Sequence, residues 1–316
     1  MMTLRISLNS KNVLSLMDLT TIEINHILKL ASSFKTDLRT QKSPRQLPGS
    51  ILGMLFEKPS TRTRISFETG MFQLGGKPIY LGINDLQLSR GESIEDTART
   101  LSLYVDCIVA RINHHDILEK LALFATIPVI NGLSNSFHPC QILADLLTIY
   151  ERKKKLEGLK LAWIGDGNNV CNDMLLGCSK VGINMSVACP KGYEPMGYVI
   201  ELAKQEGRQT NAEIIITDDP KSAAKFADII VTDTFISMGT DDEKHTREAA
   251  FLPKYQVNSN LMMLAKKECI FMHCLPATRG KEVTSDVIDG GASVVWDEAE
   301  NRLHVQKALM YLLLKD

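Results

Sequence analysis

The segment Phe56–Arg64 (FEKPSTRTR) is the most chemically informative part of this 316-residue chain. It places three hydroxyl side chains and two guanidiniums, Arg62 and Arg64, directly after an apolar run. Where a strand gives way to a helix, unpaired backbone N–H groups and the positive end of the helix dipole favour an anion. Ser60 alone would be interpreted as a helix cap. Five such residues at one corner instead predict an anion site, with phosphate as the expected ligand.

A second polar group begins a long amphipathic segment. His138 and Gln141, in the sequence His-Pro-Cys-Gln, lie three residues apart and therefore share one face of a helix. Together they offer donors for a carbonyl oxygen and an acceptor for an amine, although His138 by itself could also be a helix-capping residue. Arg111 follows the apolar run 107–110 and is expected at the same sheet edge as Arg62. Arg302, after an acidic stretch, would by itself be a solvated helix residue.

Three further motifs lie in the second half of the chain. Asp233 and Ser237, in the sequence DTFISMG, follow the apolar run 229–231 and could bind the ammonium and carboxylate of an amino acid. Asn168 and Asn169 are amides that could bind a zwitterionic substrate or form a turn. Cys274, in the sequence HCLP, could be an exposed and acidified thiol or a buried, inert one. No triad-like partner for a nucleophilic cysteine is evident.

The run Trp163–Asn169 (WIGDGNN) resembles a dinucleotide-binding turn but departs from it in two places. Val170 stands where G-x-G-x-x-G requires its third glycine, and the next apolar run ends at Ala-Cys-Pro without an acidic residue for a ribose. Asp166 would also repel a pyrophosphate. The sequence therefore argues against a nicotinamide cofactor.

Short apolar runs alternate with helical stretches from about residue 50 onward, which is typical of α/β layers around parallel sheets. The pattern predicts strands at 51–56, 79–81, 107–110, 128–130, 159–164, 185–189, 213–216, 228–231, 269–272 and 294–295. It predicts helices at 94–103, 116–124, 138–151 and 297–314. We expect two doubly wound domains joined near residues 135–155, with the active site between them at the carboxyl ends of the strands.

Composition limits the class of protein. Lys plus Arg (36) almost balances Asp plus Glu (37), so the cationic face that nucleic acids or membranes require is not expected. No apolar run approaches the roughly 20 residues that span a bilayer, and the first residues carry no export signal. Seven scattered cysteines without a C-x-x-C pair favour a reducing cytoplasm over a disulfide framework or a zinc site.

Taken together, the motifs resemble those of the aspartate and ornithine carbamoyltransferases. Ser60-Thr-Arg-Thr-Arg64 with His138-Pro-x-Gln141 is similar to that family's carbamoyl-phosphate signature, and the DTFISMG and HCLP segments are similar to its ornithine branch. The resemblance extends from about residue 50 to Arg302. It implies a carbamoyl-phosphate domain (1–137), an inter-domain helix (138–152), an ornithine domain (153–297) and a C-terminal helix (298–316) that packs back on the first domain.

The resemblance also assigns roles, residue by residue. The phosphate of carbamoyl phosphate would be held by Ser60, Thr61, Arg62 and Thr63. Its carbamoyl group would be held by Arg111, His138 and Gln141, with Arg302 adding a contact and Gln87 reaching a neighbouring subunit's site. Ornithine would be bound by Asn169, Asp233, Ser237 and Met238. Cys274 and the Leu275 carbonyl would serve both substrates, and Cys274, Arg111 and His138 would be the catalytic residues.

The implied reaction transfers the carbamoyl group to the δ-amine of L-ornithine and yields L-citrulline and phosphate, within arginine metabolism. Neither a metal nor an organic cofactor is expected, and the implied assembly is a homotrimer with shared active sites. Two alternatives stay open: a carbamoyltransferase for another amine, such as putrescine or N-acylornithine, and a non-catalytic phosphometabolite sensor on the same scaffold.

Overall fold

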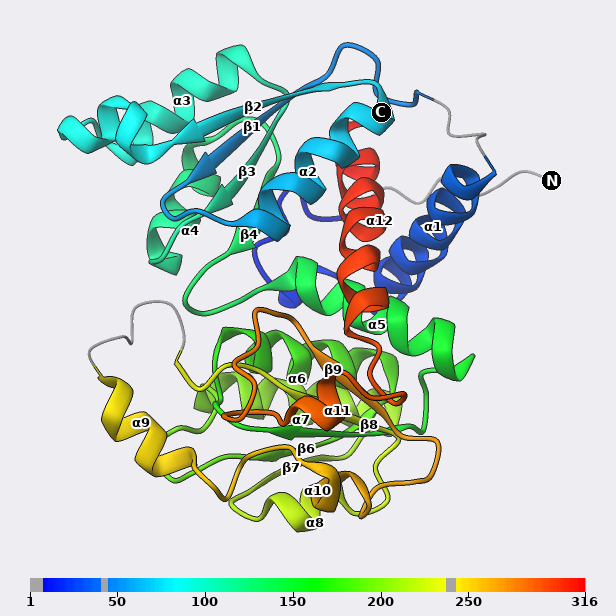
Figure 1. Ribbon diagram of the computed structural model, residues 1–316. Coiled ribbons are helices and arrows are strands. Elements are labelled where there is room, and N and C mark those ends of the chain that lie inside the picture. Colours follow the sequence, from blue (N-terminus) through cyan, green and yellow to red (C-terminus); the bar gives the residue numbers. More distant parts are fainter. Residues whose placement is uncertain (1–7, 41–44, 237–242, 316) are drawn as a thin grey trace. The chain divides into compact units, whose positions relative to one another are not determined.

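The computed structural model describes residues 8–40, 45–236 and 243–315, and it divides into two compact units (Figure 1). Unit 1 comprises Met1–Leu147 and Glu300–Asp316, and unit 2 comprises Thr148–Ala299. Both boundaries fall inside long helices, α5 (Pro139–Lys153) and α12 (Val295–Leu314). No described helix is long and apolar enough to cross a bilayer.

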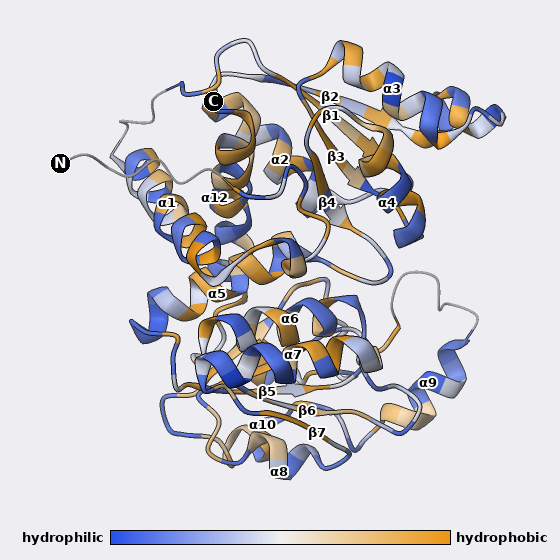
Figure 2. Cartoon of the chain, turned by 180° about the vertical axis from the view of Figure 1, so that it is seen from behind, coloured by the Kyte–Doolittle hydropathy of each residue, from blue (hydrophilic) through white to orange (hydrophobic). Residues whose placement is uncertain are grey.

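Unit 1 is built on a parallel sheet in the order β2-β1-β3-β4. Its strands are β1 (Ile51–Phe56), β2 (Lys77–Gly82), β3 (Cys107–Arg111) and β4 (Val129–Leu133). The central strands β1 and β3 are almost entirely buried and appear in hydrophobic colours in Figure 2. Strands buried on both faces are expected to be continuous apolar runs, as these are.

Helices cover both faces of this sheet. On one face, α3 (Ile94–Tyr104) and α4 (His115–Phe124) pack over Leu55, Ile108 and Ala110. On the other lie α1 (Thr21–Arg39), α2 (Thr61–Leu74) and the later part of α12 (Figure 1). A Cβ at Gly70 would lie 3.1 Å from Cγ of Lys307, so this glycine allows α2 to pack closely on α12. Short 3-10 helices complete the unit at Leu16–Asp18, Ile83–Asp85 and Gln87–Arg90.

Unit 2 has a five-stranded parallel sheet in the order β7-β6-β5-β8-β9. Its strands are β5 (Lys160–Ile164), β6 (Asn184–Ala188), β7 (Ile214–Thr217), β8 (Ile229–Thr232) and β9 (Ile270–His273). Helices α6 (Asn169–Val181) and α7 (Gly197–Thr210) pack together on one side of the sheet, while α8 (Pro220–Ala224) and α10 (Ser259–Met262) lie on the other (Figures 1 and 2). The remaining helices are α9 (Lys244–Phe251) and α11 (Ser285–Ile288).

The predicted doubly wound α/β fold is confirmed, and the ends of β1 to β9 differ from the predicted ones by at most three residues. The strand predicted at 294–295 is wrong, because Val295 begins α12 and only an isolated bridge joins Ser293 to Phe271. The two apolar residues Val294 and Val295 were too short a run to indicate a strand. The helix α1 was not predicted, although Thr20 and Glu23 form a capping box at its start.

Candidate active site

The anion-site motif of unit 1 lies where β1 ends and α2 begins. Ser60 is the N-cap of α2 and accepts a hydrogen bond from the Thr63 backbone N–H at 3.3 Å, so the chain turns here with its first helical N–H groups at the carboxyl edge of the sheet. Thr61 is exposed, Arg62 is half-buried and Thr63 is buried. Hydroxyl, guanidinium and backbone N–H donors therefore lie together at the N-terminus of α2, as an anion site requires.

Arg302 joins two motifs that are far apart in the sequence, Ser60–Arg64 and His138–Gln141. Its Nη2 donates to Oγ1 of Thr63 at 2.8 Å, and its Nη1 donates to Oε1 of Gln141 at 2.5 Å and faces Nε2 of His138 at 3.3 Å. Arg302 is itself buried, at 3% exposure. The expectation that Arg302, taken alone, is a solvated helix residue is therefore wrong. Its place beside Thr63, His138 and Gln141 is compatible with the contact that the family resemblance implies. The Nε2 amide of Gln141 donates in turn to Asp145, one helical turn further along α5.

His138 is held neutral at this site. Burial lowers the pKa of His138 well below its usual value, and the charges of Arg302, Arg111 and Arg62 lower it further. Because a guanidinium can only donate, Nε2 of His138 accepts from Arg302 and the ring proton belongs on Nδ1. The carboxyl edge of unit 1 thus combines three guanidiniums with a neutral imidazole, which suits an acyl phosphate, whose phosphate is anionic and whose carbonyl must be polarised.

Two other residues of unit 1, Arg64 and Gln87, lie apart from this network. Arg64 is ion-paired with Glu68 at 2.9 Å and stacks 3.9 Å from the Tyr80 ring centre. Arg64 therefore points in a different direction from Arg62, because two positions along a helix turn a side chain by about 200° around the axis. The role of Arg62 as an anion ligand stays a prediction. Gln87 is exposed, and in the described part of the chain no hydrogen bond connects it to the Arg302 network.

The candidate site of unit 2 is centred on Asp233, at the carboxyl end of β8. Its Oδ2 accepts from Nδ2 of Asn168 at 2.7 Å, and its Oδ1 accepts from the Thr234 N–H at 2.7 Å and from Sγ of Cys274 at 3.1 Å. Asn168 is the N-cap of α6 and Asn169 is its first residue, 9% exposed. A nearly buried carboxylate surrounded by donors in this way can orient a substrate ammonium.

The turn that carries Cys274 is supported by two buried glutamates. Glu298 accepts from the His273 backbone N–H at 3.0 Å, and Oε1 of Glu282 lies 3.4 Å from Nε2 of His273. Nδ1 of His273 accepts from the Leu275 N–H at 2.9 Å, and Leu275 has a φ of 57°. This left-handed conformation, uncommon for leucine, directs the backbone of the turn and indicates a functional constraint.

The ligand atoms of Asp233, His273 and Cys274 all lie within 4.8 Å of one another, which would suit a metal ion. Both ring nitrogens of His273 are already engaged, however, by Leu275 and Glu282. Only a carboxylate and a thiol are left at this point, so the arrangement favours an amine as the ligand. Ser237 and Met238, the other residues expected to bind ornithine, lie outside the described residues.

The turn after β5 is closed to a dinucleotide. A Cβ at Gly167 would lie 2.2 Å from the backbone nitrogen of Pro195, and the Gly167 N–H donates to the Tyr193 carbonyl at 2.8 Å. The chain itself fills the space that glycines leave for a pyrophosphate in dinucleotide-binding proteins.

Sequence reasoning gave no role to Arg247, which lies on α9 just beyond the DTFISMG segment. Its Nε donates to the Phe235 carbonyl at 2.6 Å, and its guanidinium forms a buried ion pair with Asp166. The guanidinium also lies 4.9 Å from the Tyr193 ring centre. Arg247 therefore connects α9 and Phe235, a residue of this segment, to Asp166 in the turn that follows β5. A lone arginine on a charged helix gives no sequence signal for such a contact.

This ion pair leads to a prediction about pH. Burial raises the pKa of Asp166 to about 7, against the opposing charge of Arg247. The folded protein then binds a proton that the unfolded chain has already released above its ordinary pKa of 3.8. This group's contribution to the free energy of unfolding should therefore be present at acidic pH and fall by roughly 2 kcal/mol between pH 5.5 and 7.5.

Asp166→Asn should remove that part of the pH dependence. Urea unfolding of both proteins at pH 5.5, 6.5, 7.5 and 8.5 measures it directly, because all other titrating groups are shared. A constant difference between the two proteins across this range would show that Asp166 is ionised throughout.

Comparison with known protein families agrees with the geometry of both units. The family described as "Aspartate/ornithine carbamoyltransferase, carbamoyl-P binding domain" matches residues 11–151. The family described as "Aspartate/ornithine carbamoyltransferase, Asp/Orn binding domain" matches residues 157–313. The first range contains the anion-site motif with His138 and Gln141, and the second contains Asp233, Cys274 and Arg302.

Individual relatives match over nearly their whole length. The chain is 54% identical to an ornithine carbamoyltransferase of Cenarchaeum symbiosum, over 97% of this chain and 99% of the relative. The structure of the Pyrococcus furiosus ornithine carbamoyltransferase is 50% identical with a TM-score of 0.94, over 98% of each chain. The anabolic enzyme of Campylobacter jejuni is 40% identical with a TM-score of 0.91, over 96% and 99% of the two chains. This chain belongs to the aspartate/ornithine carbamoyltransferase family.

Proposed function

We propose that this protein is an enzyme that transfers the carbamoyl group of carbamoyl phosphate to the δ-amine of L-ornithine, with L-citrulline and phosphate as products. The observation that carries the proposal is the Arg302 network, in which Thr63, Gln141 and His138 meet one buried guanidinium. The high identity to ornithine carbamoyltransferases supports the choice of amine.

Unit 1 would bind carbamoyl phosphate. Its phosphate would lie at the N-terminus of α2, where Ser60, Thr61, Arg62 and Thr63 offer donors and the helix dipole adds positive potential. The carbamoyl oxygen would accept from Arg111, from the Nδ1–H of His138 and from Thr63. As the tetrahedral intermediate forms, negative charge collects on this oxygen, so these donors stabilise the transition state more than the ground state.

Unit 2 would bind ornithine. Asp233 and Asn169 would bind the amino-acid end of ornithine, as would the predicted ligands Ser237 and Met238. Cys274 and the Leu275 carbonyl would orient the reacting groups. The δ-amine must be neutral to attack, although an alkyl amine has a pKa of about 10.4 in water. Desolvation lowers that pKa, and a carboxylate–thiol pair at 3.1 Å offers a route for the proton that leaves.

In the reaction the δ-nitrogen forms a bond to the carbamoyl carbon and loses a proton. The carbon–oxygen bond to phosphate then breaks, and the departing charge passes to Arg62 and the helix N-terminus. Holding two small reactants in line can supply several kcal/mol of the barrier reduction. We assign the enzyme to arginine metabolism in the cytoplasm, where six buried free thiols and one half-buried thiol would stay reduced.

A direct assay separates this function from its alternatives. Purified protein incubated with carbamoyl phosphate should form citrulline from ornithine and far less product from putrescine or N-acetylornithine. Faster turnover of either other amine would contradict the assigned substrate, and binding of carbamoyl phosphate without product from any amine would favour a sensor.

We further propose that the assembly is a cyclic homotrimer, as the family resemblance implies. Unit 1 exposes Ile65 and Phe72 on α2, on one side of its sheet, and Leu103, Tyr104 and Leu123 on α3 and α4, on the other. Large exposed apolar groups in two separate places suit a heterologous interface, in which one surface of each subunit meets a different surface of the next.

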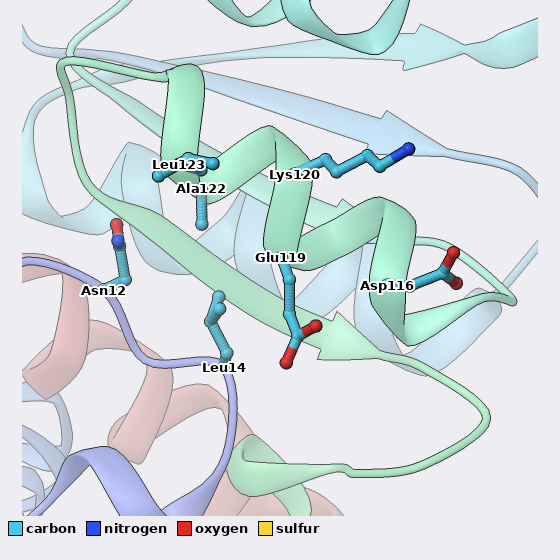
Figure 3. A pocket seen from close by; sticks show the side chains of 7 residues that line it. All are labelled: Asn12, Leu14, Asp116, Glu119, Lys120, Ala122 and Leu123. Carbon is cyan, nitrogen blue, oxygen red and sulfur yellow. The ribbon is translucent and has the colours of Figure 1, made fainter.

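A hollow beside Leu123 belongs to the same surface. It has a volume of about 650 Å³ and lies between α4 and the segment that contains Asn12 and Leu14. Figure 3 shows Glu119 pointing from α4 toward Leu14, with Leu123 further along the helix. An open concave surface next to an apolar side chain that is 75% exposed can accept side chains of a neighbouring subunit.

The trimer leads to a complementation prediction. Gln87 lies apart from the Arg302 network of its own chain, which supports its predicted role in a neighbour's site. Arg62→Ala and Gln87→Ala proteins should each be weakly active, yet every mixed trimer has one site with both residues intact. Co-refolding equal amounts should therefore restore about a quarter of wild-type activity, since three quarters of random trimers are mixed.

The control is each variant refolded alone under the same conditions, with trimer formation checked by sedimentation. If mixed trimers form and their activity equals the mean of the two variants, the active sites are not shared.

A further inference from the structure

A buried carboxylate on α5 has no role in the reaction described above. Asp145 is 1% exposed, and its neighbours in the sequence, residues 142–144 and 146–147, are all buried and apolar. Burying a carboxylate among apolar residues is unfavourable unless hydrogen bonds replace those lost from water. The position of Asp145 therefore indicates that the carboxylate has a specific hydrogen-bonding task.

The side chain of Gln141, one helical turn earlier on α5, is the donor to this carboxylate. Nε2 of Gln141 donates to Oδ1 of Asp145 at 2.8 Å, while Oε1 of Gln141 accepts from Nη1 of Arg302 at 2.5 Å. A carboxylate can only accept a hydrogen bond and a guanidinium can only donate one. Asp145 and Arg302 therefore impose the same orientation on the Gln141 amide, with its NH₂ toward Asp145 and its oxygen toward Arg302.

This orientation decides what Gln141 offers to a ligand. The amide oxygen faces the guanidinium that also contacts His138 and Thr63, and an amide oxygen has two lone pairs, so it can accept from a second donor beside Arg302. The NH₂ of a carbamoyl group is such a donor, whereas the methyl group of an acetyl phosphate is not. In the opposite orientation, the NH₂ of Gln141 would face the NH₂ of the ligand.

We infer that Asp145 is a positioning residue that keeps the Gln141 oxygen directed at the carbamoyl NH₂ and thereby makes the site prefer carbamoyl phosphate to other acyl phosphates. The inference rests on the proposed function, in which Gln141 holds the carbamoyl group. Asp145 acts through Gln141 rather than on the substrate itself. A site built around a substrate N–H group discriminates strongly against analogues that lack it.

Asp145→Asn tests this selectivity. The substitution keeps the size of the side chain but allows either a donor or an acceptor to face Gln141, so the amide orientation is no longer fixed from this side. Calorimetry should show about tenfold weaker binding of carbamoyl phosphate. Acetyl phosphate, which has the same phosphate and carbonyl groups, should bind with unchanged affinity. The preference for carbamoyl phosphate should therefore shrink by the same factor.

The matched control is Glu23→Gln, which alters another buried carboxylate of unit 1. Glu23 is 2% exposed and accepts from the Thr20 N–H at 2.7 Å in the capping box of α1. This control should lower the free energy of unfolding and keep the preference for carbamoyl phosphate. Equal losses for both acyl phosphates in Asp145→Asn would overturn the inference, as would an equally reduced preference in the control.

A reversed pair tests whether Asp145 acts through Gln141. Gln141→Glu alone sets two carboxylates against each other and should weaken carbamoyl phosphate binding roughly 100-fold. Gln141→Glu/Asp145→Asn keeps the net charge of the pair and restores its hydrogen bond with donor and acceptor exchanged, while an oxygen still faces Arg302. This double variant should regain about tenfold in affinity. Losses that simply add would show a purely structural role for Asp145 and overturn the inference.

The result for Asp145 can be separated from the result for the proposed function, because these titrations contain no ornithine. Citrulline formation by the wild-type protein, with an unaltered preference in Asp145→Asn, would overturn this inference and leave the proposed function standing. A wild-type protein that binds the two acyl phosphates equally well would also overturn it. The expected titration results without citrulline formation would support the role of Asp145 and contradict only the proposed reaction.

Discussion

Arg62→Ala is expected to lower kcat/KM for carbamoyl phosphate by roughly 10²–10³-fold, which corresponds to about 3–4 kcal/mol of transition-state stabilisation. The half-buried guanidinium at the first turn of α2 would carry much of the charge on the departing phosphate. Steady-state kinetics with ornithine saturating measures the loss. Urea unfolding should be nearly unchanged, because no described ion pair holds Arg62.

Arg64→Ala is the matched control, two residues further along the same helix. Arg64 is bound to Glu68 and stacked on Tyr80, so its removal should cost at most about 1 kcal/mol of stability. Its kcat/KM should stay within about threefold of wild type. Equal losses in both variants would mean that general positive potential, rather than a specific phosphate ligand, accounts for the effect.

Asp233→Asn is expected to lower kcat/KM for ornithine by roughly 10³-fold. The substitution keeps the size of the side chain but removes the charge that would bind an ammonium. It also replaces one acceptor by an NH₂ group facing Asn168 or the Cys274 thiol, both of which now donate to Asp233. The affinity for carbamoyl phosphate, measured by calorimetry without ornithine, should not change.

Asp228→Asn provides the comparison for this second prediction. Asp228 directly precedes the same strand and accepts from Lys266 and the Lys160 N–H. Its loss should reduce the free energy of unfolding and leave the KM for ornithine unaltered. A similar rise in KM for both variants would show that disturbance of β8, rather than loss of an ammonium ligand, is being measured.

The sequence predicted the positions of the site residues along the chain better than their contacts. Parallel strands bring their carboxyl ends to one edge of their sheet. The apolar runs before Ser60, His138 and Asp233 were therefore enough to predict that each follows such an edge in its own unit, while their roles stay predictions. The sequence did not show that Arg62 and Arg64 point in different directions. That difference becomes visible only in the folded helix, where Arg64 is paired with Glu68.

Other contacts depend on residues far apart in the chain. Arg247 is paired with Asp166 from 81 positions away, and Arg302 reaches Thr63 across 239. Single-residue patterns carry no information about such pairs. Only the family resemblance suggested a site role for Arg302; its burial beside Thr63, His138 and Gln141 agrees with that role, which stays a prediction.

The division of unit 1 into two sequence segments has a consequence for biosynthesis. Residues 300–316 follow all of unit 2 in the chain, yet they complete unit 1. On a translating ribosome, unit 2 can therefore fold as a continuous piece, whereas unit 1 must wait with the face that α12 covers still open. Thr63, His138 and Gln141 likewise lack their shared partner Arg302 during that interval. The candidate carbamoyl-phosphate site of the nascent chain is thus completed last, after unit 2 with its candidate ornithine site has been synthesised.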